Sequence, residues 1–443
     1  MTLRGKSTLK NKVPALFVGL ILYICITMFD EKEYSRRIEA LFLRHQSVQS
    51  VGFTGDAYKP GLGGMMALDA VLGHPHRSFR SIHVAGTNGK GSVCSMLAAS
   101  LAASGMKVGL YTSPHLVDFR ERIKTIGKDG FSMIPKEAVW EFLEEYGTSL
   151  EDRSFFEITT ALCFWWFARE KVDFAVIETG LGGRLDSTNI ITPEISVITS
   201  IGLDHCAILG STRQAIAGEK AGIIKNRIPV VVGGKDDETE PVFRSAAADS
   251  GSELIFASLP GDCRVSMDRM DLKGPCRDKN LATVVCTLRA IGFRENAEAI
   301  EHTAALTGLR GRWETLAPNV ICDIAHNPPA LKENFSRLES CPGPLVIVYG
   351  VMADKALDDI APLMPSGAHY ILAAPDSPRS LPVRQLQERL AALRPDLEME
   401  TADSVAAAVE AALPSAEKNA LVYIGGSTFV VSEAIKYLYD EAS

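Results

Sequence analysis

Short, almost wholly apolar runs alternate along the chain with longer segments in which apolar residues recur every three or four positions. The alternation begins near Ile82 and is typical of an α/β fold, because buried parallel strands are apolar on both faces while their connecting helices are amphipathic. We expect strands of a first unit over residues 81–85, 107–111, 174–178, 195–199, 230–232 and 254–256, with helices over 92–104 and 280–291.

A second, smaller set of alternating elements follows a polar stretch over residues 261–278. Its expected strands span 320–323, 345–349, 369–373 and 421–424, and its expected helices include 383–393 and 404–413. The pattern therefore predicts an α/β protein with two units, the larger over residues 28–305 and the smaller over 306–443. We place the boundary between them near residues 303–309.

The N-terminal residues 1–27 are a separate apolar extension with two open interpretations. Four basic residues precede an apolar run over 13–29, which is the pattern of a signal anchor or a short membrane span. Alternatively, the start codon is assigned too far upstream and the protein begins at Met28. Contact with a membrane is expected only if residues 13–29 belong to the protein.

Composition narrows the class of protein. With 443 residues, of which 46% are hydrophobic and 23% charged, the chain can bury more than one large core. The formal charge of −8 does not favour a nucleic-acid partner. Nine cysteines without a Cys-x-x-Cys pair argue against a disulfide framework or a zinc ribbon, and favour a reducing compartment such as the cytoplasm.

A glycine-rich segment between the first expected strand and the next helix has the composition of a phosphate-binding loop. Backbone N–H groups of such a loop close on phosphate oxygens, and the helix N-terminus adds a partial positive charge. We expect the lysine to reach the terminal phosphates and the serine hydroxyl to bind magnesium. The loop is a variant, because Val84 occupies the position of the first glycine in the usual pattern. Its residues are Gly86, Thr87, Asn88, Gly89, Lys90, Gly91 and Ser92.

Two further strand ends carry candidate metal ligands. Glu178 ends an apolar strand, and ligands of open α/β sheets bind at the carboxyl ends of strands. His205 follows the next strand, although magnesium prefers oxygen ligands and only manganese readily accepts an imidazole. Lys220 and Lys225, at the end of an expected helix, have by themselves the pattern of surface charge.

Six segments occur in a characteristic order: YKPGL (58–62), HVAGTNGKGS (83–92), YTSPHL (111–116), ETGLGGRLD (178–186), EKAGI (219–223) and DIAHNP (323–328). Together they resemble the folylpolyglutamate synthase/dihydrofolate synthase family of the Mur ligase superfamily. The resemblance runs from about Met28 to the C-terminus. It implies a P-loop ATPase domain with a parallel-rich sheet, a smaller C-terminal Rossmann-like domain, and an active site between the two.

The resemblance also implies roles for individual residues. Lys90 and Ser92 match the ATP phosphate and magnesium positions, and Glu178 and His205 match a second metal site, so the implied cofactors are ATP and two Mg²⁺ ions. The segment 111–122 resembles the part that shapes the pterin pocket. One departure is Cys276-Arg277, where the family usually has His-Gln. The remaining implied positions are Lys220 as a carbamylated lysine, Asn280, Arg312 and Asp323 as nucleotide contacts, and His326 with Asp323 as catalytic residues of the interdomain motif.

The function implied is ATP-dependent addition of L-glutamate to dihydropteroate, to the glutamate tail of folate, or to both, through an acyl phosphate, by a monomer. One alternative is another amino-acid ligase of the Mur superfamily. About 57 residues separate Met28 from Gly86, too few for the nucleotide-sugar domain that precedes the loop in murein-precursor ligases. A nonenzymatic alternative is a membrane-tethered nucleotide-binding switch, which would need neither Asp323 nor a second α/β unit.

Overall fold

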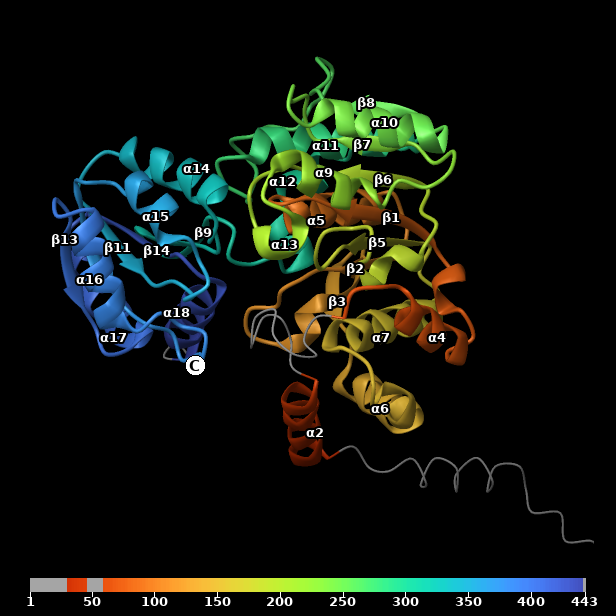
Figure 1. Cartoon of the computed structure of the whole chain (residues 1–443), viewed down its shortest axis with the longest axis horizontal. Coiled ribbons are helices and arrows are strands. Elements are labelled where there is room, and N and C mark those ends of the chain that lie inside the picture. The colour runs from red at the N-terminus through yellow and green to blue at the C-terminus, as the bar shows by residue number, and fades with distance from the viewer. Residues whose placement is uncertain (1–29, 46–58, 441–443) are drawn as a thin grey trace, which may run out of the picture.

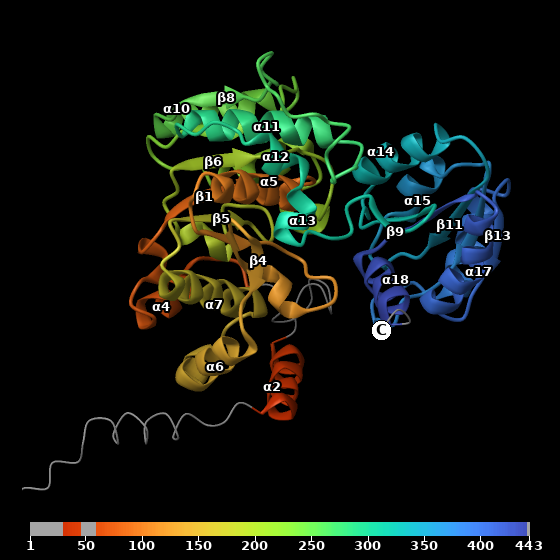
Figure 2. The ribbon, with the colours of Figure 1, turned by 180° about the vertical axis from the view of Figure 1, so that it is seen from behind.

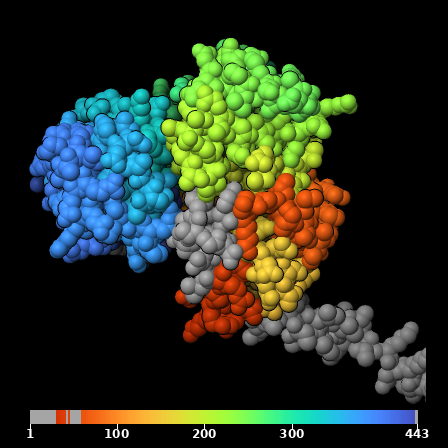
Figure 3. Space-filling view, in the orientation of Figure 1, coloured from red at the N-terminus to blue at the C-terminus, as the bar shows by residue number. Residues whose placement is uncertain are grey.

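Two β-sheets organise the described part of the chain, the first over residues 80–256 and the second over residues 314–425 (Figures 1 and 2). The computed structural model describes residues 30–45 and 59–440, so the expected anchor at 13–29 lies outside the described residues. In the space-filling view the second unit forms a lobe beside the first (Figure 3). None of the described helices is long and apolar enough to cross a bilayer.

The first sheet has eight strands in the order β4-β3-β2-β5-β1-β6-β7-β8. Its six parallel strands are β1 (Arg80–Ala85), β2 (Val108–Tyr111), β5 (Phe174–Glu178), β6 (Ile195–Ile198), β7 (Val230–Val232) and β8 (Leu254–Phe256). The hairpin β3 (Ile123–Gly127) and β4 (Gly130–Met133) adds an antiparallel edge. Strand β1 lies between β5 and β6, and Val84 is paired with Glu178, so the chain that follows β1 leaves the sheet beside Glu178.

Helices cover both faces of this sheet. On one face α5 (Lys90–Ala103) packs with α11 (Arg277–Ala290), α12 (Ala297–Glu301) and α13 (Thr303–Thr307). The residues of α5 from 91 to 102 are all buried, which explains why it is apolar or small all round rather than amphipathic. The other face carries α4 (Gly63–Val71), α6 (Lys136–Leu150) and α7 (Phe155–Glu170), and α9 (Arg213–Ala221) and α10 (Glu240–Ser250) flank β6 and β7.

The second sheet has six strands in the order β13-β12-β11-β14-β10-β9, all parallel except β9. Its core lies on both faces, against α14 and α16 on one side and α17 and α18 on the other. The strands are β9 (Glu314–Ala317), β10 (Val320–Asp323), β11 (Leu345–Tyr349), β12 (Ala368–Leu372), β13 (Glu398–Thr401) and β14 (Leu421–Gly425). The helices are α14 (Pro328–Glu339), α16 (Val383–Leu393), α17 (Val405–Glu417) and α18 (Thr428–Asp440).

The predicted α/β class with mostly parallel sheets is confirmed. Expected strands form within about two residues of their predicted bounds. The helix expected from Ser92 begins two residues earlier, at Lys90, because Gly89 is its N-cap. The antiparallel hairpin β3–β4 and the edge strands β9 and β13 were not expected. The chain crosses between the sheets after α13, and the boundary at 305/306, which falls inside α13, stays a prediction.

Candidate active site

The glycine-rich loop leaves the buried strand β1 and turns directly into α5. Gly86 has φ +153° and Gly89 has φ +86°, in the region where a side chain is strained. A Cβ on Gly89 would lie 2.5 Å from Asn280 Oδ1, on α11. Glycine at position 89 therefore permits both the left-handed turn and the close approach of Asn280, and the N-terminal amides of α5 stay open to a ligand.

Two lysines converge on the carbonyl that begins this loop. The ammonium groups of Lys90 and Lys220 donate to the carbonyl oxygen of Gly86 at 3.2 and 2.8 Å, and Lys90 also donates to that of Thr87 at 3.3 Å. Burial, aided by the charge of Lys90, lowers the pKa of Lys220 to about 7. The expectation of surface charge is wrong for Lys220: α9 turns it inward beneath the loop, where it is 4% exposed.

Glu178 presents a buried carboxylate at the end of β5. Its Oε1 lies 3.9 Å from Lys90 Nζ, and the N–H of Ser113 donates to its Oε2 at 3.3 Å. Burial raises the pKa of Glu178, and the charges of Lys90 and Arg312 oppose that rise. Ser92, in the first turn of α5, lines the same cavity as Glu178. The carboxylate of Glu178 and the hydroxyl of Ser92 are oxygen donors of the kind that hard divalent cations prefer.

His205 lies beyond the end of β6, at the start of the short helix α8 (Cys206–Leu209). Its backbone is left-handed, with φ +52°. Burial lowers the pKa of its imidazole to about 4, although the carboxylate of Asp204 acts in the opposite direction. At neutral pH the ring is therefore uncharged and has a lone pair for a metal ion.

Arg312, Asp323 and His326 reach the site from the crossing between the units and from the second sheet. Arg312 is partly buried, and its charge lies near those of Asp323 and Glu178. Asp323, at the end of β10, accepts hydrogen bonds from the N–H groups of Trp313 and Ala325, both at 2.9 Å, and from the Asn334 amide at 2.8 Å. These three bonds hold the Asp323 carboxylate in one orientation.

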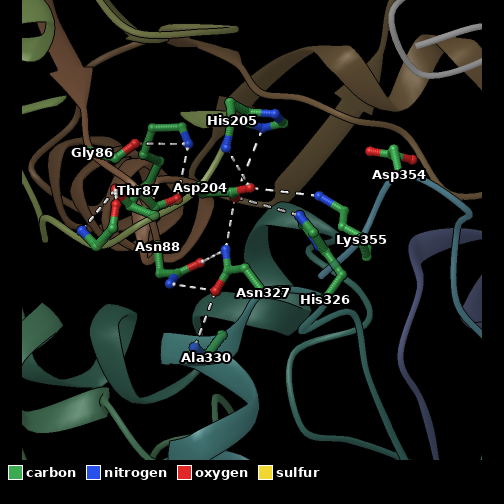
Figure 4. Close-up of polar contacts among 12 residues, drawn as sticks. Gly86, Thr87, Asn88, Asp204, His205, His326, Asn327, Ala330, Asp354 and Lys355 are labelled. Carbon is green, nitrogen blue, oxygen red and sulfur yellow. Dashed lines mark hydrogen bonds and ion pairs between the residues drawn. The ribbon is translucent and has the colours of Figure 1, made fainter. Parts of the chain in front are cut away.

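Asp204 is one of the residues through which the first unit contacts the second (Figure 4). Its carboxylate accepts a hydrogen bond from the Asn327 amide at 2.8 Å, and it lies 3.5 Å from Lys355 Nζ and 3.8 Å from His326 Nε2. Asn327 also exchanges two hydrogen bonds with Asn88 of the loop, at 3.1 and 3.0 Å. The loop and the second unit are thus directly joined.

Two adjoining cavities meet at Ser113, Pro114 and His326. We name the first the loop cavity; it is lined by Thr87 to Ser92, Glu178, Asn280, Arg312, Asp323 and His326, among others. We name the second the aromatic cavity; it is lined by Phe155 and Phe156, by Arg122, Lys355 and Arg379, and by Asp186, His205 and Ser427. The structure thus gathers most of the predicted site residues at one cavity, puts His205 in the neighbouring one, and buries Lys220 below the loop.

Three residues at this junction were not predicted: Asp204, Asn327 and Lys355. Each follows the carboxyl end of a strand, namely β6, β10 and β11. That position was the usable signal, since ligands of open α/β sheets collect there. The ion pair between Asp204 and Lys355 joins residues 151 positions apart, so no local sequence pattern predicts it.

Comparison with known proteins first defines the class. Residues 84–273 match the Mur ligase middle domain, and residues 311–428 match the Mur ligase glutamate ligase domain. The phosphate loop lies in the first match, and Arg312, Asp323 and His326 lie in the second. The chain is therefore a Mur ligase.

Relatives narrow the class to a family. A Bacillus subtilis dihydrofolate synthase/folylpolyglutamate synthase is 34% identical over 86% of this chain and 95% of its own length. The chain spans about half, 48%, of a longer Haloferax volcanii relative, a probable bifunctional folylpolyglutamate synthase/dihydropteroate synthase. This chain belongs to the folylpolyglutamate synthase/dihydrofolate synthase family.

Solved structures agree with this assignment. Escherichia coli FolC in complex with DHPP and ADP has 29% sequence identity and a TM-score of 0.79, over 93% of this chain and 98% of that one. A bifunctional folylpolyglutamate synthase/dihydrofolate synthase with Mn, AMPPNP and L-glutamate bound has 27% identity and a TM-score of 0.75, over 86% and 95% of the two chains. The chain is thus an enzyme, a ligase of this family.

Proposed function

We propose that this chain adds L-glutamate to dihydropteroate, to the glutamate tail of folate, or to both, in an ATP-dependent reaction at the junction of its two units. The observation that carries the proposal is the pairing of Asn88 with Asn327 over the phosphate loop. It brings the loop, Glu178 and His205 of the first unit opposite Arg312, Asp323 and His326 of the second. A ligase needs such a junction, because the phosphoryl donor and the acceptor must meet away from water.

ATP would bind with its phosphates on the amides at the start of α5. The loop from Gly86 to Ser92 would supply the amides. Lys90, which donates to the carbonyl oxygens of Gly86 and Thr87 in this structure, would turn toward the terminal phosphate instead. Asn280 and Asp323 would contact the rest of the nucleotide, since both line the loop cavity. Arg312, from the crossing between the units, would place a second positive charge near the transferred phosphoryl group.

Two Mg²⁺ ions are expected at this junction. Ser92 would hold one ion beside the phosphates, and Glu178 with His205, from the two adjoining cavities, would hold the other. Glu178 offers a buried carboxylate and His205 an uncharged imidazole, so each has a lone pair for a metal ion. When bound, the ions neutralise negative charge on the phosphoryl oxygens.

Lys220 would act after its conversion to a carbamate by CO2, in which the amine nitrogen attacks the carbon of CO2 and releases a proton to water. Carbamate formation requires an uncharged amine, and a lysine with a pKa of about 7 is largely uncharged at slightly alkaline pH. The product is an anion, which would attract Lys90 and a metal ion where the ammonium of Lys220 now repels both.

The aromatic cavity would hold the pterin-containing acceptor and glutamate. Phe155 and Phe156 offer flat apolar surfaces for a ring system, and Asp186 offers a carboxylate for its N–H groups. Lys355 and Arg379 line the same cavity and would bind carboxylates. The acceptor carboxylate would then face the loop cavity past Ser113 and His326, which both cavities share.

The reaction follows from this arrangement. The acceptor carboxylate attacks the γ-phosphorus of ATP, the bond from that phosphorus to the bridging oxygen breaks, and ADP leaves with an acyl phosphate formed. The amine of L-glutamate then attacks the acyl carbon, and phosphate leaves after the amine loses a proton. His326, with its pKa lowered mainly by burial, is an uncharged imidazole placed to accept that proton.

We also propose that the chain works as a monomer in the cytoplasm. One chain supplies both faces of the site, so a second copy is not needed to complete it. The sequence has nine cysteines without a Cys-x-x-Cys pair, a pattern that supports a reducing compartment.

An activity assay tests the proposal. The full chain is incubated with ATP, Mg²⁺ and L-glutamate, with either dihydropteroate or tetrahydrofolate, and ADP release and the glutamylated product are measured. We expect ADP release to require both acceptor and glutamate, and Lys90→Ala to reduce kcat/KM by at least about 100-fold. ADP release that is independent of acceptor and glutamate would disprove the proposal.

A further inference from the structure

A cluster of two histidines and an aspartate lies outside the active site. Asp69 is in α4, and His74 and His76 follow it in the turn that leads to the short helix η2 (Pro75–Arg77). His74 Nδ1 lies 2.7 Å from one carboxylate oxygen of Asp69, and His76 Nδ1 lies 2.6 Å from the other. One nitrogen or oxygen from each residue lies within 4.8 Å of the other two.

The backbone folds around the Asp69 carboxylate. Gly73 and His74 have consecutive positive φ angles, +77° and +62°, and the N–H of His74 donates to the carbonyl oxygen of Asp69 at 2.8 Å. This reversal returns the His74 ring to the end of α4 that holds Asp69. Pro75 then begins η2, which brings His76 to the other carboxylate oxygen.

The ion-pair partners of Asp69 are unusual for a buried carboxylate. The Asp69 side chain is only 3% exposed, and among the described residues its ion-pair partners are the two imidazoles, with no lysine or arginine. A buried carboxylate normally has a cationic partner or binds a metal ion. Here each oxygen of the buried carboxylate faces an imidazole nitrogen, and imidazole is itself a common metal ligand.

We propose that Asp69, His74 and His76 bind one divalent transition-metal ion of the zinc, cobalt or nickel class. Each imidazole would carry its proton on Nε2 and offer the lone pair of Nδ1 to the ion, which replaces the two N–H···O contacts. One carboxylate oxygen and two imidazole nitrogens are the donors that such ions prefer, whereas magnesium prefers oxygen alone. His74 is 42% exposed, so water can complete the coordination.

This site is separate from the proposed catalytic metals. The cluster precedes the start of β1, and the phosphate loop follows its end. Six residues of extended strand separate the two by roughly 20 Å. His76 also packs near Phe164 of α7, with ring centroids 6.5 Å apart. The ion would therefore join α4, η2 and the region of α7 at the end of the sheet opposite to the nucleotide, and would stabilise rather than catalyse.

A metal titration of the full chain tests the proposal. The protein is stripped with a chelator and titrated with Zn²⁺ alone, in the absence of ATP, by isothermal calorimetry. The informative variants are His74→Asn and His76→Asn, because an asparagine amide can still donate to Asp69 but is a poor metal ligand. His302→Asn, on an exposed histidine of the first unit, is the matched control.

We expect wild type and His302→Asn to bind one more equivalent of Zn²⁺ than either cluster variant, or to bind it at least tenfold more tightly. Equal stoichiometry and affinity in all four proteins would overturn the proposal. A second measurement does not depend on variants: anomalous diffraction at the zinc edge from crystals of the wild-type chain soaked in Zn²⁺. We expect a peak among Asp69, His74 and His76, and the absence of a peak there would overturn the proposal even if the variants failed to fold.

Discussion

Asn88 and Asn327 exchange two amide hydrogen bonds, Asn88 donating at 3.1 Å and Asn327 at 3.0 Å, across the junction of the two units. Asn88 belongs to the phosphate loop. Asn327 is also the N-cap of α14, where its side-chain oxygen accepts from the N–H of Ala330 at 3.1 Å. The position of the second unit is therefore sensitive to the conformation of the loop that would bind ATP.

Breaking this pair should slow the reaction more than it destabilises the protein. The variant Asn327→Ser keeps a capping oxygen at the start of α14 but cannot reach Asn88. We expect it to reduce kcat/KM for ATP by at least about 5- to 30-fold, since the two hydrogen bonds with Asn88 contribute about 1–2 kcal/mol together and the hydrogen bond from Asn327 to Asp204 is lost as well. The measurement is a double-mutant cycle with Asn88→Ala. Non-additive losses are expected, and fully additive losses would show that the pair does not act as a unit.

Lys124 should hold the crossing between the units in place. Its buried ammonium donates to the carbonyl oxygens of Thr307 and Gly308, at 2.9 and 3.0 Å, at the end of α13. Lys124→Met leaves both carbonyls without a donor, and we expect the free energy of unfolding to fall by about 1–3 kcal/mol. Urea denaturation measures it. Lys128→Met, in the same hairpin but exposed, is the control and should change stability by less than about 0.5 kcal/mol.

The titration of Lys220 should make stability depend on pH. Burial lowers its pKa from 10.5 in the unfolded chain to about 7 in the folded one. Below pH 7 both states carry the proton, whereas between pH 7 and 10.5 only the unfolded state does, so the free energy of unfolding rises with pH in that window. One such group contributes up to about 1.4 kcal/mol per pH unit.

The measurement is urea denaturation between pH 7 and pH 9 in bicarbonate-free buffer. Lys220→Met should remove this part of the pH dependence. Lys235→Met, which changes a lysine side chain that is 61% exposed, should leave it unchanged. Parallel curves for wild type and Lys220→Met would contradict the assignment of a low pKa to Lys220.

Central parallel strands and the phosphate loop could be predicted because their signals are local. Strands such as β5 are buried along their whole length and are visible in the sequence as continuous apolar runs. The glycines of the phosphate loop lie within one short segment, residues 86–92, so the loop can be found from the sequence alone. Edge strands such as β4 and β13 are partly exposed on both faces, so they lack that signal. They form because a neighbouring strand supplies the hydrogen bonds.

A residue of the candidate site could be predicted where it lies within a recognisable sequence motif. Lys90, Glu178 and His326 lie within such motifs. The contact of Asp204 with Lys355 and the burial of Lys220 could not be predicted, because each depends on how distant elements pack. A lysine in an amphipathic helix such as α9 has the same sequence pattern whether it faces water or a second layer of structure.

The proposed chemistry has a distinctive isotopic consequence. If the acceptor carboxylate attacks ATP, one of its oxygens must leave with the phosphate when the amide bond forms. The measurement uses dihydropteroate labelled with heavy oxygen in its carboxylate and follows the label by mass spectrometry of the released phosphate during turnover with ATP and L-glutamate. The result expected is one labelled oxygen in each phosphate released; unlabelled phosphate, with the label retained in the product or lost to water, would contradict carboxylate activation at the loop.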